Sequence, residues 1–214
     1  LPLLQLLSQG PTLRHRPVRA LVLTPTRELA AQVFENVKEY SAFLDLKSAV
    51  IFGGVNQNSQ VNQLRQGVDI LVATPGRLLD LNNQGLLSLS KIEILVLDEA
   101  DRMLDMGFLR DIERIMKLMP SRRQNLMFSA TFSHDIKKLA HGILHHPVQV
   151  EATPENTTVD AISQKVYRVA KGLKTGLIIK LISDGNWKQV LVFTRTKHGA
   201  NKLCEKMVSA GISA

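Results

Sequence analysis

Cysteine is almost absent from this sequence of 214 residues, and it has no long hydrophobic run. Cys204 is the only cysteine, so a disulfide within the chain and a metal site made of several thiolates are both excluded. The lack of cysteine favours a reducing compartment, and we expect a cytoplasmic protein. No apolar stretch approaches the roughly 20 residues that a membrane-spanning helix needs, so no membrane partner is expected. Leu1 to Leu7 lacks a basic flank and an initial Met, and predicts the end of a helix rather than a signal peptide.

Two kinds of binding motif are also missing. The phosphate-binding pattern G-x-x-x-x-G-K-[ST] does not occur, because neither Gly10 nor the pair Gly53-Gly54 is followed by Gly-Lys-Thr at the required spacing. These residues therefore offer no lysine of that loop to the β- and γ-phosphates of a nucleotide. The six histidines are not spaced with cysteine or acidic residues as metal ligands are, so we expect no metal site built on histidine.

Basic residues outnumber acidic ones, by 27 to 19, which gives a net charge of +8. An excess of this size favours polyanionic partners such as nucleic acid, although a merely basic protein would show it too. The excess is uneven: residues 1 to 154 carry 17 basic and 15 acidic groups, and residues 155 to 214 carry 10 and 4. The second part is therefore the more basic surface.

Short apolar runs alternate with amphipathic helical patterns along the chain. The runs are mostly continuous rather than alternating, which is typical of parallel strands that are buried on both faces. This order predicts an α/β fold with a doubly wound parallel sheet, the predicted strands being 21–23, 49–52, 70–72, 94–97 and 126–128. We expect a first domain over 1–151, a polar linker over 152–163 and the beginning of a second domain over 164–214. In that second domain, strands are predicted at 165–169 and 190–193, and helices around 173–181 and 200–207.

An acidic run follows one predicted strand directly. Asp98-Glu99-Ala100-Asp101 comes after the apolar residues 94–97, so its side chains emerge at the carboxyl end of a buried strand. In an open α/β sheet the ligand crevice lies there, and a strand-end Asp is the usual anchor for the Mg²⁺ of a bound nucleotide. Taken alone, the run is better explained by acidic residues at a helix N-terminus that face solvent.

Two Thr-Pro motifs and a glycine pair follow three other strands. Thr24-Pro25-Thr26-Arg27 and Thr74-Pro75-Gly76-Arg77 each predict a helix start, with Thr24 or Thr74 as N-cap and the proline at the first helical position. Free backbone N–H groups at such a start suit a phosphate. Gly53-Gly54 would let a polymer backbone approach closely. Each motif alone is explained by capping or a turn, but together they favour a track for successive phosphates.

Six motifs occur in the order and spacing of one known family: Pro25 to Ala30, Gly53-Gly54, Thr74 to Arg77, Asp98 to Asp101, Ser129-Ala130-Thr131, and Val192 to Lys197. In these motifs the chain resembles the DEAD-box ATP-dependent RNA helicases over essentially its whole length. Residues 102–108 and 189–201 look most like the bacterial RhlE-type branch. The resemblance implies a RecA-like domain with the start of a second one, ATP and Mg²⁺ as cofactors, and RNA as partner. The sequence identifies no protein partner.

The resemblance also implies roles for individual residues. Asp98 and Glu99 are the expected catalytic residues: Asp98 would hold Mg²⁺, usually through water, and Glu99 would position the hydrolytic water. Asp101, Ser129 and Thr131 would couple the nucleotide state to RNA binding. The expected contacts to the RNA sugar-phosphate backbone are Pro25, Thr26, Arg27, Gly53, Gly54, Thr74, Gly76, Arg77, Arg195 and Lys197. Backbone contacts imply little sequence preference, and the placement implies that one strand is bent rather than tracked along.

The resemblance places the lysine-bearing phosphate loop before Leu1 and the late arginine motifs after Ala214. We therefore expect no measurable ATP hydrolysis by these 214 residues alone, since an arginine finger is worth about 10³ to 10⁵ in rate. One alternative is an ATP-independent RNA-binding or interaction module, which the missing lysine favours. Another is a related DNA-directed translocase. Binding to RNA and DNA of one sequence would separate these, because 2′-hydroxyl contacts favour RNA.

Overall fold

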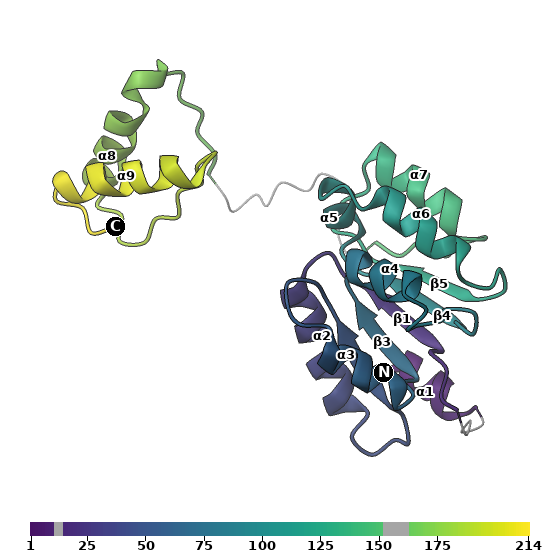
Figure 1. Cartoon of the computed structure of the whole chain (residues 1–214). Helices are drawn as coiled ribbons and strands as arrows, with labels where there is room; N and C mark the ends of the chain where they lie inside the picture. The colour runs from purple at the N-terminus through teal and green to yellow at the C-terminus, as the bar shows by residue number, and fades with distance from the viewer. Residues whose placement is uncertain (11–14, 152–162) are drawn as a thin grey trace. The chain divides into compact units, whose positions relative to one another are not determined.

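The computed structural model describes residues 1–10, 15–151 and 163–214, which fall into two compact units, Leu1–Gln149 and Val150–Ala214 (Figure 1). The linker predicted over 152–163 lies outside the described residues except for its last residue. Among the described residues, no helix combines the length and apolar character that crossing a membrane requires.

The first unit contains a five-stranded sheet in which every neighbouring pair of strands is parallel. The strand order is β2-β3-β1-β4-β5. The strands are β1 (Ala20–Leu23), β2 (Ser48–Ile51), β3 (Ile70–Ala73), β4 (Ile94–Leu97) and β5 (Gln124–Met127). The pairing is level, since Leu23 is opposite both Ala73 and Leu97, so the carboxyl ends of the strands meet at one edge of the sheet. The predicted α/β class with a parallel sheet is confirmed.

Apolar side chains on both faces of the sheet explain why these runs form buried strands. On one face, Leu21, Leu71 and Leu95 belong to the larger core cluster. On the other face, Val22 and Val72 pack in a separate cluster. Fully burying a side chain of this size contributes about 1.5–3 kcal/mol, so a strand that is apolar at every position is stable only between two layers of helices.

The helices supply those two layers (Figure 1). They are α1 (Pro2–Ser8), α2 (Arg27–Tyr40), α3 (Asn58–Arg65), α4 (Pro75–Asn83), α5 (Ala100–Asp105), α6 (Leu109–Lys117) and α7 (His134–Ile143). On the Leu21 face the core receives Leu78 of α4, Ile112 of α6 and Ile136 of α7. On the Val22 face it receives Leu4 of α1 and Ala30 of α2. The helix predicted at Leu1 to Leu7 is present as α1.

The described part of the second unit contains the 3-10 helix η1 (Lys171–Leu173) and the helices α8 (Lys174–Gly185) and α9 (Lys197–Ser209). Both helices were predicted. The strands predicted at 165–169 and 190–193 are wrong, because the described residues of this unit form no strand. Val166 is 93% exposed and Phe193 is 88% exposed. A strand needs a neighbouring strand to satisfy its backbone groups, and the sequence pattern shows only that these segments are suited to one.

Candidate functional site

The predicted site residues of the first unit gather where the strands end. Thr24 continues from β1, and its N–H donates to the carbonyl of Ala73 at 3.0 Å. Asp98 continues from β4, and its N–H donates to the carbonyl of Leu23 at 3.0 Å. The hydrogen-bond ladder of the sheet therefore extends one residue beyond the strands and fixes the backbone positions of Thr24 and Asp98.

The backbone turns sharply between Asp98 and Ala100. Glu99 has φ 49° and ψ 53°, the left-handed region, which costs a residue other than glycine about 1–3 kcal/mol. The neighbours hold it there: Ala100 is fully buried and its N–H donates to the carbonyl of Phe128 at 3.0 Å. Asp98 is half-buried and accepts from the N–H of Glu99 at 3.0 Å, whereas the Glu99 side chain is exposed. Backbone strain of this kind clusters at functional sites.

Asp101 is joined to the loop that follows β5. One of its carboxylate oxygens accepts both the N–H and the hydroxyl of Thr131, each at 3.0 Å. Ser129 donates its own hydroxyl to the carbonyl of Thr131 at 2.8 Å. Burial alone would raise the pKa of Asp101, but hydrogen bonds from Thr131, Arg102 and Ser129 outweigh it and lower that pKa below its ordinary value. The structure thus brings the three predicted coupling residues together around an ionised carboxylate.

The first Thr-Pro motif differs from its prediction. The N-cap is Thr26 and not Thr24, because Thr26 has extended backbone angles and its hydroxyl accepts from the N–H of Leu29 at 3.2 Å. The helix therefore begins at Arg27, two residues later than expected. At the second motif the prediction is confirmed: Thr74 is the N-cap and α4 begins at Pro75.

One hydrogen-bonded turn recurs in three of the motifs. In each, a hydroxyl donates to the carbonyl of the Thr two residues later, the pairs being Thr24 with Thr26 at 3.3 Å, Ser129 with Thr131 at 2.8 Å, and Thr194 with Thr196 at 3.0 Å. Thr196 then caps α9 by accepting from the N–H of Gly199 at 3.0 Å, as Thr26 caps α2. The two units therefore begin one helix each in the same way, with Arg27 or Lys197 at its first position.

The predicted RNA contacts of the first unit line one shallow concavity of about 520 Å³. Its lining includes seven of the eight residues predicted there, namely Pro25, Thr26, Arg27, Gly53, Thr74, Gly76 and Arg77. The eighth, Gly54, has φ +82°, which favours glycine, and a Cβ there would lie 3.5 Å from the guanidinium of Arg27. Both Gly53 and Gly76 would have open space around an added Cβ, so their backbones are accessible to a ligand.

The two arginines of this concavity differ in what holds them. The side chain of Arg27 is 59% exposed and pairs with Glu28 at 2.7 Å. The side chain of Arg77 is only 11% exposed and donates to Gln60 and to the carbonyl of Val55. Gln60 was not predicted as a site residue. The feature that could have indicated it is its place beside Val61 on the buried face of a short helix, where a polar side chain needs a partner.

The remaining predicted residues, Arg195 and Lys197, belong to the second unit. Arg195 lies within the turn from Thr194 to Thr196 and Lys197 begins α9, and both side chains are exposed. Both are therefore accessible to a charged partner.

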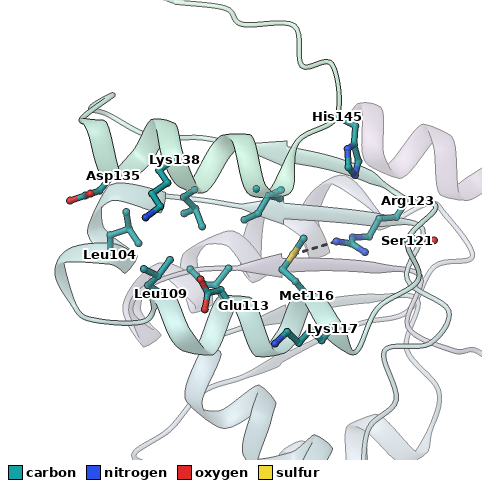
Figure 2. Close-up of a pocket in the computed structure, with 14 residues that line it drawn as sticks. Leu104, Leu109, Glu113, Met116, Lys117, Ser121, Arg123, Asp135, Lys138 and His145 are labelled. Atoms are coloured by element: carbon teal, nitrogen blue, oxygen red, sulfur yellow. Dashed lines mark hydrogen bonds between the residues drawn. The ribbon is translucent and has the colours of Figure 1, made fainter.

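A larger concavity of about 920 Å³ lies between α6 and α7 (Figure 2). Leu109 and Met116 contribute apolar surface, and Glu113, Lys117 and Lys138 contribute charged groups. None of the predicted site residues lines it. Nor do the described parts of the chain bring three metal-ligating side chains together anywhere. The predicted site residues of the first unit therefore lie at the carboxyl edge of the sheet and not in this concavity.

Comparison with known proteins finds a family model and several relatives for this chain. A family model described as DEAD/DEAH box helicase matches residues 1–139. The chain is 42% identical over 199 residues to the ATP-dependent RNA helicase RhlB of Pseudomonas aeruginosa, covering 92% of this chain and 50% of that protein. It is 42% identical over 182 residues to RhlB of Xanthomonas axonopodis, covering 84% of this chain and 32% of that protein. The chain thus spans half or less of the length of these relatives, whose name differs from the RhlE-type branch expected. The chain belongs to the DEAD/DEAH box helicase family.

Proposed function

We propose that this protein is an ATP-dependent RNA helicase, in which RNA-stimulated ATP hydrolysis is coupled to local unwinding or remodelling of RNA duplexes. The observation that carries the proposal is that one sheet edge holds both the Asp98-Glu99 pair and the concavity lined by the Thr-Pro motifs. The names of the relatives support the same activity.

Asp98 and Glu99 fit the requirements of a hydrated Mg²⁺ bound to ATP. Mg²⁺ prefers oxygen ligands and is commonly bound through one or two carboxylates together with water and substrate phosphates. Asp98 is half-buried at the end of β4, and the N–H of Glu99 orients its carboxylate at 3.0 Å. The bound ion would neutralise charge that develops on the phosphates. The exposed carboxylate of Glu99 would orient the attacking water and accept its proton.

Asp101 would couple the nucleotide site to the RNA site. It lies on α5 directly after the Asp98-Glu99 turn and holds Thr131 through two hydrogen bonds of 3.0 Å. A shift of the turn would therefore move the loop after β5 with it. In the proposed reaction, the exposed guanidinium of Arg27 and the backbone of Gly53, Gly54 and Gly76 would contact RNA phosphates, with Arg195 and Lys197 contributing from the second unit.

Finer aspects of the proposal concern the branch and the location. Residues 102–108 and 189–201 resemble the RhlE-type branch, whereas the relatives above are named RhlB, so the RhlE-type branch stays a prediction. The free thiol of Cys204 suits a reducing compartment, and we propose a cytoplasmic location with RNA as the partner.

Phosphate release from ATP tests the activity, measured with and without RNA on the gene product that contains these residues. RNA should stimulate release, and Glu99→Gln should lower it by about 10²-fold or more because the group that accepts the proton is lost. Equal rates for wild type and Glu99→Gln would contradict the catalytic role. The 214 residues alone are expected to release no measurable phosphate; RNA-stimulated release from them would overturn that expectation.

Competition between single-stranded RNA and DNA of one sequence tests the substrate class on the same protein. Tighter binding to RNA supports the proposal, because contacts to the 2′-hydroxyl exist only in RNA. Binding to RNA without any ATP hydrolysis by the whole gene product would support the binding-module alternative instead. A preference for DNA would support the translocase alternative.

A further inference from the structure

The loop between β2 and α3 is held at two of its carbonyl groups by side chains from helices. Gln60 of α3 donates its amide N–H to the carbonyl of Phe52 at 3.1 Å. Arg77 of α4 donates to the carbonyl of Val55 at 3.0 Å. These two carbonyls lie on either side of Gly53-Gly54, so the backbone is held by a hydrogen bond both before and after the glycine pair.

The two side chains that hold the loop are also bonded to each other. Arg77 donates to the amide oxygen of Gln60 at 3.1 Å. Gln60 is 5% exposed, so its amide must find partners within the protein. It does so with its N–H on the loop and its oxygen on Arg77, so both the donor and the acceptor of the amide are used.

A second connection fastens the end of the same loop. Gln57, the N-cap of α3, exchanges hydrogen bonds of 3.2 Å and 3.3 Å with Gln84, the C-cap of α4. Gln84 also donates to Asp80 at 2.9 Å, and Asp80 lies 3.7 Å from the guanidinium of Arg77. The loop is thereby tied to α3 at Phe52 and to α4 at Val55 and Gln57.

We infer that Gln60 and Arg77 are positioning residues for RNA: they hold the Gly53-Gly54 loop in a shape that accepts the sugar-phosphate backbone. Arg77 then acts through the loop and not as a phosphate ligand. The inference rests on the proposed function and assigns to Arg77 a different role from Arg27. A glycine-containing loop loses much conformational freedom when it is ordered, and ordering it before binding improves affinity.

The contacts of the two arginines support this division. Arg77 has three internal partners and an 11% exposed side chain, so a phosphate could reach it only by displacing hydrogen bonds that keep Gln60 satisfied. Arg27 is 59% exposed and has one exposed carboxylate as its partner, which a phosphate can replace. Arg27 is therefore the guanidinium that contacts RNA directly.

Lysine substitutions separate the two roles, measured as the affinity of the 214-residue chain for a fluorescent single-stranded RNA at low salt. Arg27→Lys should bind within about threefold of wild type, because a lysine remains a point charge for phosphate. Arg77→Lys should bind about tenfold more weakly, as weakly as Arg77→Ala, because an ammonium lacks the planar fork that reaches Gln60 and Val55 together. Recovery of binding in Arg77→Lys would identify a direct phosphate ligand and overturn the inference.

Gln60 is tested by the same assay against a matched control. Gln60→Glu keeps the size and the acceptor for Arg77 but loses the donor to Phe52, and should weaken RNA binding about tenfold, as should Gln60→Ala. Gln63→Ala changes an exposed glutamine on the same helix and should bind as wild type. Thermal unfolding followed by circular dichroism identifies any variant that has lost its fold, and Gln60→Glu then serves in place of Gln60→Ala.

Two further readouts distinguish positioning from general stability. Amide hydrogen exchange should rise at residues 53–57 in Gln60→Glu and Arg77→Lys without RNA present. The slope of log affinity against log salt should stay at the wild-type value in these variants, whereas Arg27→Gln should reduce it by about 0.7. Unchanged exchange and affinity in the Gln60 variants would overturn the inference alone. A gene product containing these residues that binds no RNA would overturn the proposed function as well.

Discussion

At the scale of single residues, Asp101 is a carboxylate whose charge stabilises a contact between two segments of the chain. Its carboxylate accepts two hydrogen bonds from Thr131, and its pKa is held below the ordinary value. A carboxylate with a lower pKa in the folded state stabilises that state above its unfolded pKa of about 3.9, and the stabilisation is lost as the pH falls through the folded value. The link to Thr131 is therefore strongest at neutral pH.

This gives a pH-dependent prediction for Asp101→Asn. At pH 7 the variant should lose about 1–2 kcal/mol in the free energy of unfolding, because an amide cannot accept from Arg102 and Thr131 together without turning a donor toward one of them. As the pH falls through the lowered pKa of Asp101 the wild type should lose the same stabilisation, and the difference should shrink. Urea unfolding at pH 7, 5 and 3 measures both.

Asp105→Asn supplies the control for this experiment, since Asp105 is an exposed carboxylate on the same helix. It removes the same charge without removing the hydrogen bonds to Thr131, so it should change stability little. A difference between wild type and Asp101→Asn that is the same at every pH would show that the stabilisation does not depend on the ionised carboxylate.

At the scale of helices and turns, two glycines isolate the effect of backbone conformation. An added Cβ would meet nothing within 4 Å at Gly142, inside α7, or at Gly107, between α5 and α6. Gly142→Ala should raise the free energy of unfolding by about 0.5–1 kcal/mol, because alanine favours the helix. Gly107 has φ +83°, so Gly107→Ala should lower it by about 1–2 kcal/mol.

Urea unfolding followed by far-ultraviolet circular dichroism compares these two variants with wild type. Both substitutions add one methyl group in open space, so each serves as the control for the other. A loss of stability in Gly142→Ala would indicate that the added methyl group makes an unfavourable contact, and that this contact outweighs the gain in helix propensity. Equal effects from both substitutions would contradict the backbone explanation.

The same scale shows which elements the sequence could predict. The strands β1, β3 and β4 were predictable because every residue is apolar and the neighbours supply turn and capping signals. The helix α3 was missed, because Asn58-Ser59-Gln60 gives it a polar start and only Val61 and Leu64 mark its apolar face. The prediction of strands at 165–169 and 190–193 was wrong because the sequence pattern of a segment does not show whether a partner strand is available.

The candidate site was predictable where a motif is local and unpredictable where it depends on distant contacts. Thr74 and Pro75 predict a helix start from two adjacent residues, and in the structure α4 begins at Pro75. At the first motif two threonines compete for the cap, and the sequence alone does not show that Thr24 is buried. The link from Arg77 to Gln60 joins residues 17 apart in the sequence, and no local pattern indicates it.

At the scale of the whole molecule, the two units differ greatly in their cores. Within the described part of the second unit, only Ile182 and Met207 are buried hydrophobic residues, whereas buried residues fill both faces of the sheet in the first. Because apolar burial is the main stabilising term, the second unit should unfold at a lower concentration of urea. Trp187, the only tryptophan, lies in the second unit and reports on it.

Tryptophan fluorescence and circular dichroism should therefore give different unfolding midpoints, with the fluorescence transition first. Ile182→Ala should lower the midpoint of the fluorescence transition. Leu71→Ala should destabilise the first unit by about 2–5 kcal/mol and lower the main transition in circular dichroism. Coincident transitions in every variant would instead indicate one cooperative unit.

The uneven charge is the second property of the whole molecule, and it leads to a prediction about salt. Arg195 and Lys197 lie in the more basic part of the chain, at the helix start that repeats the Thr26-Arg27 arrangement. If both contact phosphates of single-stranded RNA, changing both to Gln should reduce the slope of log affinity against log salt by about 1.4. Lys202→Gln with Lys206→Gln removes the same charge from exposed positions further along α9 and should leave that slope unchanged. Equal reductions in both double variants would show that RNA responds to net charge alone, so affinity titrations over a range of salt concentrations decide whether this helix start is an RNA-binding site.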